Sequence, residues 1–269
     1  VGLDPSIVQY LPVSNIEECT IDSFITDAAI DNFKLATKES TLTAPNEVAV
    51  TTDVAGHGVK YAGGKYYVAA NMVAIGEETY ASLAEALAAA KAGDQLTFLA
   101  DIKEDVTIST KVTIDGAGKT YTGKMTAKAD VTVKNVNFDG QGYNGYAFET
   151  RGANYVTIED CTAQNYGYGF VQLASGTALT TVKNVTVSDM NYGVKVDYSG
   201  AVVLENVDIT AAVAAVLNSN YGAKTITIKD SKLNILGTWD RNDTIKTTYV
   251  RNHDRRINSA FACKFKRFF

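Results

Sequence analysis

The sequence predicts an all-β fold: a right-handed parallel β-helix, or solenoid, over residues 76–238, with a capping helix at its start and a small domain before it. Three observations predict it: an eight-residue segment recurs, apolar residues alternate within each copy, and the alternation changes phase at one fixed position. The copies align without gaps: VTVKNVNF from Val131, VTIEDCTA from Val156, TTVKNVTV from Thr180, VVLENVDI from Val202 and ITIKDSKL from Ile226.

The change of phase requires a bend in the chain. Val131 and Val133 alternate, and then Val136 and Phe138 continue in the opposite phase. Side chains of a strand alternate faces with a period of two, so a flat strand cannot bury both pairs. We expect the bend at the Asn or Asp between the pairs, because these types tolerate left-handed backbone better than other non-glycine residues. The bend residues lie 25, 24, 22 and 24 residues apart: Asn135, Asp160, Asn184, Asn206 and Asp230.

Bends at this interval stack each strand on the equivalent strand of the previous coil. Of the twenty predicted inward positions eighteen are apolar, and the exceptions are Thr180 and Ser231. A third inward strand follows each bend about ten residues later, around Phe148, Phe170 and Val194. The bend residues are expected to form a ladder of stacked side chains along one edge, which bonds coil to coil. Lys or Glu precedes each bend residue, and this predicts an exposed column of alternating charge.

A short amphipathic helix is expected ahead of the coils. In TYASLAEALAAAKAGDQLTFLADI the apolar residues Leu83, Ala86, Leu87 and Ala90 share one helical face, and Gly93 is expected to end the helix before a strand. The first coil of a solenoid would otherwise leave a sheet edge and core exposed. We therefore expect this helix to cap the solenoid.

The capping segment SLAEALAAAKAGDQLTFLADI, the stretch VTIDGAGKTYTG and the VTVKNVNFDG coils resemble the right-handed β-helix proteins of the pectate lyase-like superfamily. More narrowly, they are similar to repeats in bacteriophage tail or capsid-associated proteins and in bacterial surface proteins. The resemblance covers residues 78–236. It implies the fold, but it selects no activity, because the same coil carries lyases, hydrolases, adhesins and inert virion parts.

The two ends of the chain fall outside the repeat. Residues 1–75 are expected to form a small β domain or an anchoring segment. Within them, the pattern of residues 14–38 fits an amphipathic helix and short strands equally well. GVKYAGGKYYVAA predicts a hairpin with its turn at Gly63-Gly64. Residues 239–269 form a separate basic segment, in which Trp239 is a candidate cover for the last coil.

The charge distribution sets this C-terminal segment apart. Residues 241–269 carry eight Lys or Arg and two Asp, a net charge of +6, and the overall charge of −5 leaves −11 for residues 1–240. Such a split is typical of a terminal segment that docks on an acidic partner, although a merely solvated tail has the same composition. The candidate docking residues are Arg251, Arg255, Arg256, Lys264, Lys266 and Arg267.

The sequence offers little material for catalysis or metal binding. His57 and His253 are the only histidines, the three cysteines lie far apart, and the outward carboxylates are expected singly on different faces. Polysaccharide lyases cluster carboxylates around calcium, and glycosidases place two of them at one bond. Cys161 aligns with valines of other coils and is expected in the core. We expect no catalytic residue, no metal, no cofactor and, without a long apolar run, no membrane span.

Tyrosines recur at the glycine-rich corners from coil to coil. Exposed, stacked tyrosine rings are the surface that sugar rings bind, whereas inward rings only pack the core or cover corners. The candidate carbohydrate-binding residues are Tyr143, Tyr166, Tyr168, Tyr192 and Tyr221.

Together these observations favour a non-enzymatic structural and attachment protein: a β-helix spike, fibre or capsid-decoration element at a virion surface. The expected partners are other virion or cell-surface proteins, polysaccharide, and further copies of the chain, for example in a trimer. No specific nucleic acid is expected. Two alternatives stay open: a bacterial cell-surface adhesin that binds carbohydrate, and a polysaccharide lyase or tailspike depolymerase whose site forms between subunits.

Overall fold

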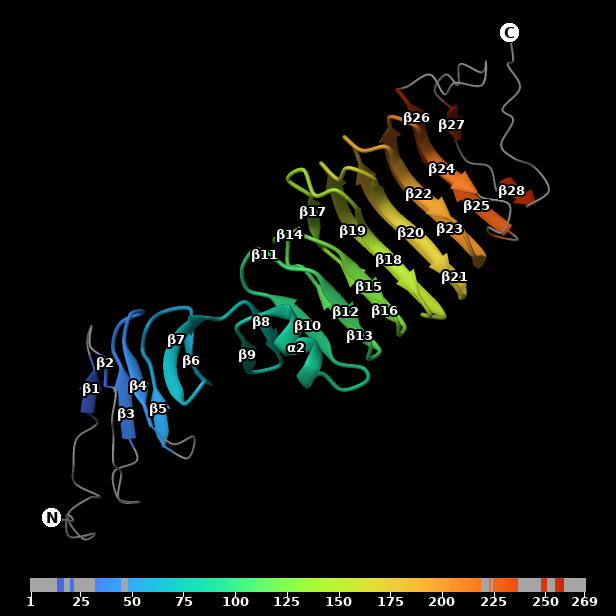
Figure 1. Cartoon of the computed structure of the whole chain (residues 1–269). Coiled ribbons are helices and arrows are strands. Elements are labelled where there is room, and N and C mark those ends of the chain that lie inside the picture. The colour runs from blue at the N-terminus through green and yellow to red at the C-terminus, as the bar shows by residue number, and fades with distance from the viewer. Residues whose placement is uncertain are drawn as a thin grey trace, which may run out of the picture. The chain divides into compact units, whose positions relative to one another are not determined.

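The structure is a computed structural model that describes residues 14–16, 20–21, 32–44, 48–218, 223, 225–236, 248–250 and 255–258. Most of this part of the chain is β-strand, with one α-helix. The chain divides into two compact units, residues 1–72 with 79–81 and residues 73–78 with 82–269 (Figure 1).

The first unit is built from short strands in two small sheets. One sheet is parallel and holds β1 (Ser14–Ile16), β3 (Asn32–Leu35) and β5 (Ala49–Thr51). The other holds β2 (Thr20–Ile21), β4 (Thr41–Thr43), β7 (Lys65–Ala70) and β6 (His57–Ala62). Residues 14–38, where described, therefore form strands. The expected hairpin is confirmed as β6 and β7, which pair antiparallel across Gly63-Gly64.

The second unit is a parallel β-solenoid, as the sequence predicts, and its strands stack into three ladders. The first ladder holds β10 (Gln95–Phe98), β13 (Val112–Asp115), β16 (Val131–Lys134), β19 (Tyr155–Gln164), β21 (Thr177–Val187), β23 (Ser199–Ala211) and β25 (Thr225–Lys229). The second holds β11 (Ile102–Lys103), β14 (Thr120–Thr122), β17 (Asn137–Asp139), the later halves of β19, β21 and β23, and β26 (Ser231–Ile235). The third holds β12 (Val106–Ile108), β15 (Met125–Ala127), β18 (Tyr146–Arg151), β20 (Gly169–Ser175), β22 (Tyr192–Val196) and β24 (Ala214–Asn218).

Short strands flank the ends of these ladders. At the start lie β8 (Val73–Ile75), antiparallel to β10, and β9 (Glu78–Tyr80). At the other end β27 (Thr248–Val250) pairs with β26, and β28 (Arg255–Asn258) pairs with β25, both antiparallel. The coils begin with β10, the strand that follows the capping helix. Figure 1 shows the strands of the third ladder, β12 to β24, side by side.

Every bend occurs where the sequence places it. The backbone is left-handed at each bend residue, with φ of 54° at Asn135, 55° at Asp160, 53° at Asn184, 50° at Asn206 and 44° at Asp230. All twenty expected inward side chains of the five copies are buried, including the hydroxyls of Thr180 and Ser231. The single left-handed residue thus lets one continuous strand contribute apolar side chains to the core before and after the corner.

Side-chain hydrogen bonds connect the bend residues of successive coils. Asn206 Nδ2 donates to Asn184 Oδ1 at 2.9 Å, and Asn184 Nδ2 donates to Asp160 Oδ1 at 2.8 Å. At an earlier coil, Asn135 Nδ2 donates to Asp115 Oδ1 at 3.0 Å. An Asp therefore fits this ladder as the acceptor for the amide of the next coil.

A column of alternating charge lies beside this ladder. The strand registers place residues of opposite sign directly over one another from coil to coil. Lys134 Nζ lies 3.3 Å from Asp115 Oδ2. Opposite charges on facing strand positions stabilise a sheet, by about 0.2–1 kcal/mol per pair. The column consists of Asp115, Lys134, Glu159, Lys183, Glu205 and Lys229.

The expected cap is the helix α2 (Leu83–Ala89). The Ser82 hydroxyl accepts the Glu85 amide at 3.0 Å, and Glu104 from the first coil accepts the Leu83 amide at 2.6 Å. The carboxylate also lies favourably at the positive end of the helix dipole. On its inner face Leu83, Ala86 and Leu87 are buried. The helix ends at Ala89, with Ala90 as its C-cap, ahead of Gly93, which the sequence favours as its terminator.

An aromatic row fills the core across four coils. The ring centroids of Phe98 and Tyr121 lie 6.3 Å apart, those of Tyr121 and Phe138 5.8 Å, and those of Phe138 and Phe170 5.5 Å. Cys161 is also buried, and this burial raises the pKa of its thiol to about 12. The thiol is therefore a core group, as its alignment with valines predicts, and not a nucleophile.

Part of the C-terminal prediction lies outside the described residues: Trp239, Arg251, Lys264, Lys266 and Arg267. Arg255 and Arg256 belong to β28, whose backbone alone is described. No helix in the described chain has the length and apolar content that a membrane crossing requires.

Replacement of Asn184 tests the bend. We expect Asn184→Ala to lower the free energy of unfolding by about 1–2 kcal/mol for the left-handed backbone, and further for the lost ladder bonds. Asn184→Gly loses the same side-chain bonds but removes the backbone strain, so it should be the less destabilised variant. Urea unfolding followed by circular dichroism measures both. An alanine variant as stable as the glycine variant would contradict this account.

Two aspartates predict a loss of stability in acid. Burial alone would raise the pKa of Asp115, but hydrogen bonds from Asn135 and Lys134 outweigh it and lower that pKa. The hydrogen bond from Asn165 likewise lowers the pKa of Asp139. A pKa below the unfolded value stabilises the fold above that value, and this contribution disappears as the pH falls toward the folded pKa. Urea unfolding between about pH 5 and pH 3 should therefore show falling stability. In the double variant Asp115→Asn, Asp139→Asn the free energy of unfolding should fall less over this pH range. An equal fall in wild type and variant would contradict the role of these two aspartates.

Candidate functional site

A groove of about 530 Å³ lies on the outer face of the third ladder. Its floor comes from outward side chains of consecutive strands, and its wall comes from tyrosines at and beside the glycine-rich corners. The strand registers place Glu149, Gln172 and Lys195 directly over one another, one from each of β18, β20 and β22. Adjacent strands are about 4.8 Å apart, so this floor presents one polar side chain at each such step along the solenoid.

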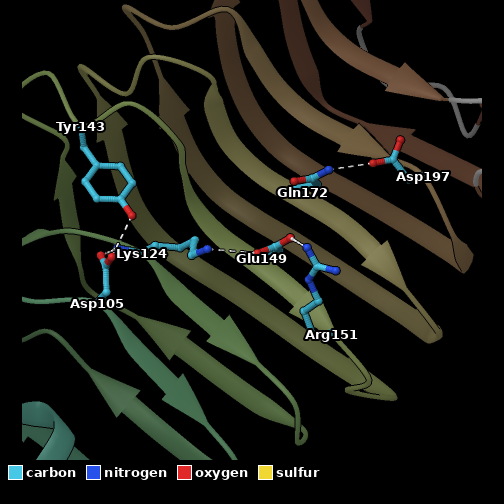
Figure 2. A network of polar contacts seen from close by, with 7 residues as sticks. All are labelled: Asp105, Lys124, Tyr143, Glu149, Arg151, Gln172 and Asp197. Atoms are coloured by element: carbon cyan, nitrogen blue, oxygen red, sulfur yellow. Dashed lines mark hydrogen bonds and ion pairs between the residues drawn. The ribbon is translucent and has the colours of Figure 1, made fainter.

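Glu149 is the most buried polar group of the floor. Its carboxylate is held by two cations: Arg151 Nη2 lies 2.6 Å from Oε1, and Lys124 Nζ lies 3.3 Å from Oε2 (Figure 2). Lys124 precedes β15 and Arg151 ends β18, so three positions on two coils converge here. Burial of a carboxylate requires such partners, because an unpaired buried charge is costly.

A second polar contact joins the next two coils. Gln172 Nε2 donates to Asp197 Oδ2 at 2.8 Å, and Lys195 Nζ lies 3.1 Å from the same oxygen. Figure 2 shows the Gln172–Asp197 contact on the same face as the Glu149 cluster. The carboxylates of Glu149 and Asp197 thus lie on one surface, whereas the sequence predicts outward carboxylates singly on different faces. This corrects that expectation.

Tyrosines from three coils form the wall of the groove. The rings of Tyr146 and Tyr168 stack with centroids 6.0 Å apart and an interplanar angle of 29°, and Tyr168 is 49% exposed. Tyr192 lies in the next coil, and Tyr143 donates its hydroxyl to Asp105 Oδ2 at 2.9 Å (Figure 2). The wall therefore offers aromatic ring surface directly beside a polar floor.

Two hydroxyls of this wall, those of Tyr143 and Tyr146, stay protonated at neutral pH. Burial raises the pKa of Tyr146 well above its ordinary value, and the proximity of Tyr192 and Asp197 adds to the shift. Burial also raises the pKa of Tyr143, reinforced by its hydrogen bond to Asp105. Neither phenol is poised to act as a base at neutral pH, but each keeps its hydroxyl as a hydrogen-bonding group.

Gly169 makes room for the stacked rings. A Cβ atom at this position would lie 2.9 Å from Tyr146 Cε1 and 2.4 Å from the backbone oxygen of Tyr192. The strand register places Gly169 between Tyr146 and Tyr192 in successive coils. The missing side chain therefore allows the Tyr146 ring to lie over β20 and approach Tyr168.

The predicted tyrosines separate into three groups. Tyr143, Tyr168 and Tyr192 line the groove. Tyr166 does not: it is 1% exposed, and its hydroxyl donates to the backbone oxygen of Gly123 at 3.0 Å. Tyr166 is thus a core residue, and its place among the sugar-binding candidates is corrected. Tyr221 lies outside the described residues.

The floor is the part that sequence reasoning missed. The eight-residue repeat covers only the first two strands of each coil, so it does not set the third strands in register. The signal was nevertheless present, because Phe148, Val171 and Val194 are aligned inward residues and the next residue in each strand is Glu149, Gln172 or Lys195. Within the described residues, no group of three or more His, Cys, Asp or Glu is placed to hold a metal ion.

No protein-family model, curated protein or solved structure matches the chain. The chemistry of the groove is therefore the basis for a functional assignment. Aromatic faces next to fixed hydrogen-bonding and charged groups suit a ligand with alternating apolar faces and hydroxyl edges, as sugar rings have.

Substitution of Gly169 tests how the wall is built. Gly169→Ala forces the new methyl group against the Tyr192 backbone, so we expect a loss of about 1–3 kcal/mol in the free energy of unfolding. Ser175→Ala on the same strand is the control and should change it by less than about 0.5 kcal/mol. Thermal and urea unfolding measure both variants. Equal stability of the two would mean that the close approach over Gly169 does not exist.

Proposed function

We propose that the chain is a non-enzymatic structural and attachment protein, a β-helix spike, fibre or decoration element of a virion that binds surface carbohydrate through the groove on its third ladder. One observation carries the proposal: the stacked Tyr146 and Tyr168 rings stand beside the polar column of Glu149, Gln172 and Lys195. The column spans three successive coils, so the groove suits a short extended chain of sugar units rather than a single small molecule.

The proposal includes a family assignment. We place the solenoid among the right-handed β-helix proteins of the pectate lyase-like superfamily, near the phage tail and capsid-associated members. The capping helix, the three parallel ladders and the bend residue of each coil support it. A solenoid of this kind is a rigid rod whose lateral faces stay available for binding, which suits a spike or fibre.

The position of Glu149 favours binding over bond cleavage. Both of its carboxylate oxygens are engaged by cations, one by Arg151 and one by Lys124. A general acid or nucleophile must direct an oxygen at the reacting bond, and a glycosidase needs two such carboxyls across it. Incubation with host polysaccharides and a search for new reducing ends or unsaturated products tests this part. Detectable turnover would replace our proposal with the depolymerase alternative.

The location of the chain separates a virion element from a bacterial adhesin, since both would use the same groove. Antibody labelling of the source particle followed by electron microscopy should place the chain on the virion surface. Labelling confined to a bacterial cell wall would establish the adhesin instead.

Removal of an exposed ring tests the groove itself. We expect Tyr168→Ala to weaken binding to a surface polysaccharide by roughly tenfold, about 1–2 kcal/mol, because an aromatic contact surface is lost. Tyr155→Ala is the matched control, since Tyr155 is 59% exposed but does not line the groove. Isothermal titration calorimetry or a glycan array measures both. Equal losses in the two variants would exclude the groove as the binding site.

A further inference from the structure

The groove presents two cations to solvent around one buried carboxylate. The Arg151 side chain is 56% exposed and that of Lys124 is 35% exposed, whereas the Glu149 side chain between them is 7% exposed. In the second cluster the Lys195 side chain is 28% exposed and that of Asp197 is 21% exposed. The buried Glu149 carboxylate orients Arg151 and Lys124, and these two cations provide the surface that a ligand meets.

The lining of the groove is correspondingly basic. Three cationic side chains line it, Lys124, Arg151 and Lys195, against the single carboxylate of Glu149. Asp197 and Asp105 lie outside the lining and are already engaged, the first by Gln172 and Lys195 and the second by Tyr143. The charge of Lys195 is matched by Asp197, so the exposed cationic surface of the groove is formed by Arg151 and Lys124 around the buried Glu149, on a chain whose net charge is −5.

We propose that the groove binds an anionic glycan, one whose sugar units carry carboxylate, sulfate or phosphate groups. This inference rests on the proposed carbohydrate-binding function and specifies its ligand class. Arg151 is the principal anion-binding residue, because its guanidinium offers several N–H donors in one plane and uses only part of them on Glu149. Lys124, on the other side of Glu149, adds a second cation to the same subsite.

The remaining groups fit the rest of such a ligand. The donors of Arg151, Gln172 and Lys195 come from three successive coils, about 4.8 Å apart from strand to strand. Consecutive acidic sugar units in an extended chain would meet a donor at each step, while Tyr168 packs against a sugar face. Uncharged glycans would gain the ring contact but would leave the cationic surface without counter-charges.

The test compares wild type with Arg151→Gln and Lys124→Gln on an array of microbial and host-cell surface polysaccharides that pairs neutral glycans with uronate-bearing, sulfated and phosphorylated ones. We expect wild type to retain the acidic glycans selectively, and each variant to bind them about tenfold more weakly or worse. Binding by wild type should also fall as NaCl is raised from 0.05 to about 0.5 M, because salt screens exposed charges. Lys183→Gln is the matched control, since Lys183 belongs to the charge column on the first ladder.

The outcomes separate the two levels of the proposal. Binding to acidic glycans that is weakened by Arg151→Gln and by salt, but not by Lys183→Gln, supports the anionic ligand. The class of acidic glycan that wild type binds, whether uronate-bearing, sulfated or phosphorylated, identifies the anionic group. Equal binding to neutral glycans, or salt-insensitive binding, overturns the anionic ligand and leaves the attachment function standing. No binding to any arm overturns both. Circular dichroism checks that each variant is folded, and the salt dependence of wild type decides the question should a variant fail to fold.

Discussion

One left-handed residue per coil is the constraint on which the solenoid depends. At Asn135, Asp160, Asn184, Asn206 and Asp230 the backbone turns a corner that an ordinary L-residue adopts at a cost of about 1–2 kcal/mol. That corner changes the phase of alternation, so a single strand supplies core residues to two faces. Asn and Asp lower the cost of the conformation, and several of their side chains also bond to the bend residue of a neighbouring coil.

The groove is a by-product of this regularity. Because every coil returns to the same register, an outward position on the third ladder becomes a column, and Glu149, Gln172 and Lys195 occupy one such column. Where a corner carries tyrosine and the strand beside it carries Gly169, the ring lies over the sheet and forms a wall. The site therefore needs no insertion or loop domain: small changes of side chain in successive coils build it.

The sequence predicted the coils well because their signal is local and repeated. The bend residues, the buried positions around them and the capping helix all follow from periodicity, and the structure confirms them. The candidate site was only partly predictable. Tyr166 and Tyr168 are two residues apart in one glycine-rich corner, yet one is buried and the other exposed. Which of them faces the core depends on the path of the corner, and its two glycines, Gly167 and Gly169, allow paths that no period specifies. The cations around Glu149 come from different coils and become neighbours only once the third strands are in register.

The column of alternating charge has a consequence for how a repetitive chain finds its order. The coils are similar enough that a folding chain could stack one coil on the wrong neighbour. Acid and base alternate strictly from Asp115 to Lys229, so omission of any single coil within the column brings two residues of like sign face to face, such as Lys134 on Lys183. Like charges on facing strand positions repel. The column thus destabilises a stack with a missing coil, while the complete stack keeps opposite charges facing one another at every step.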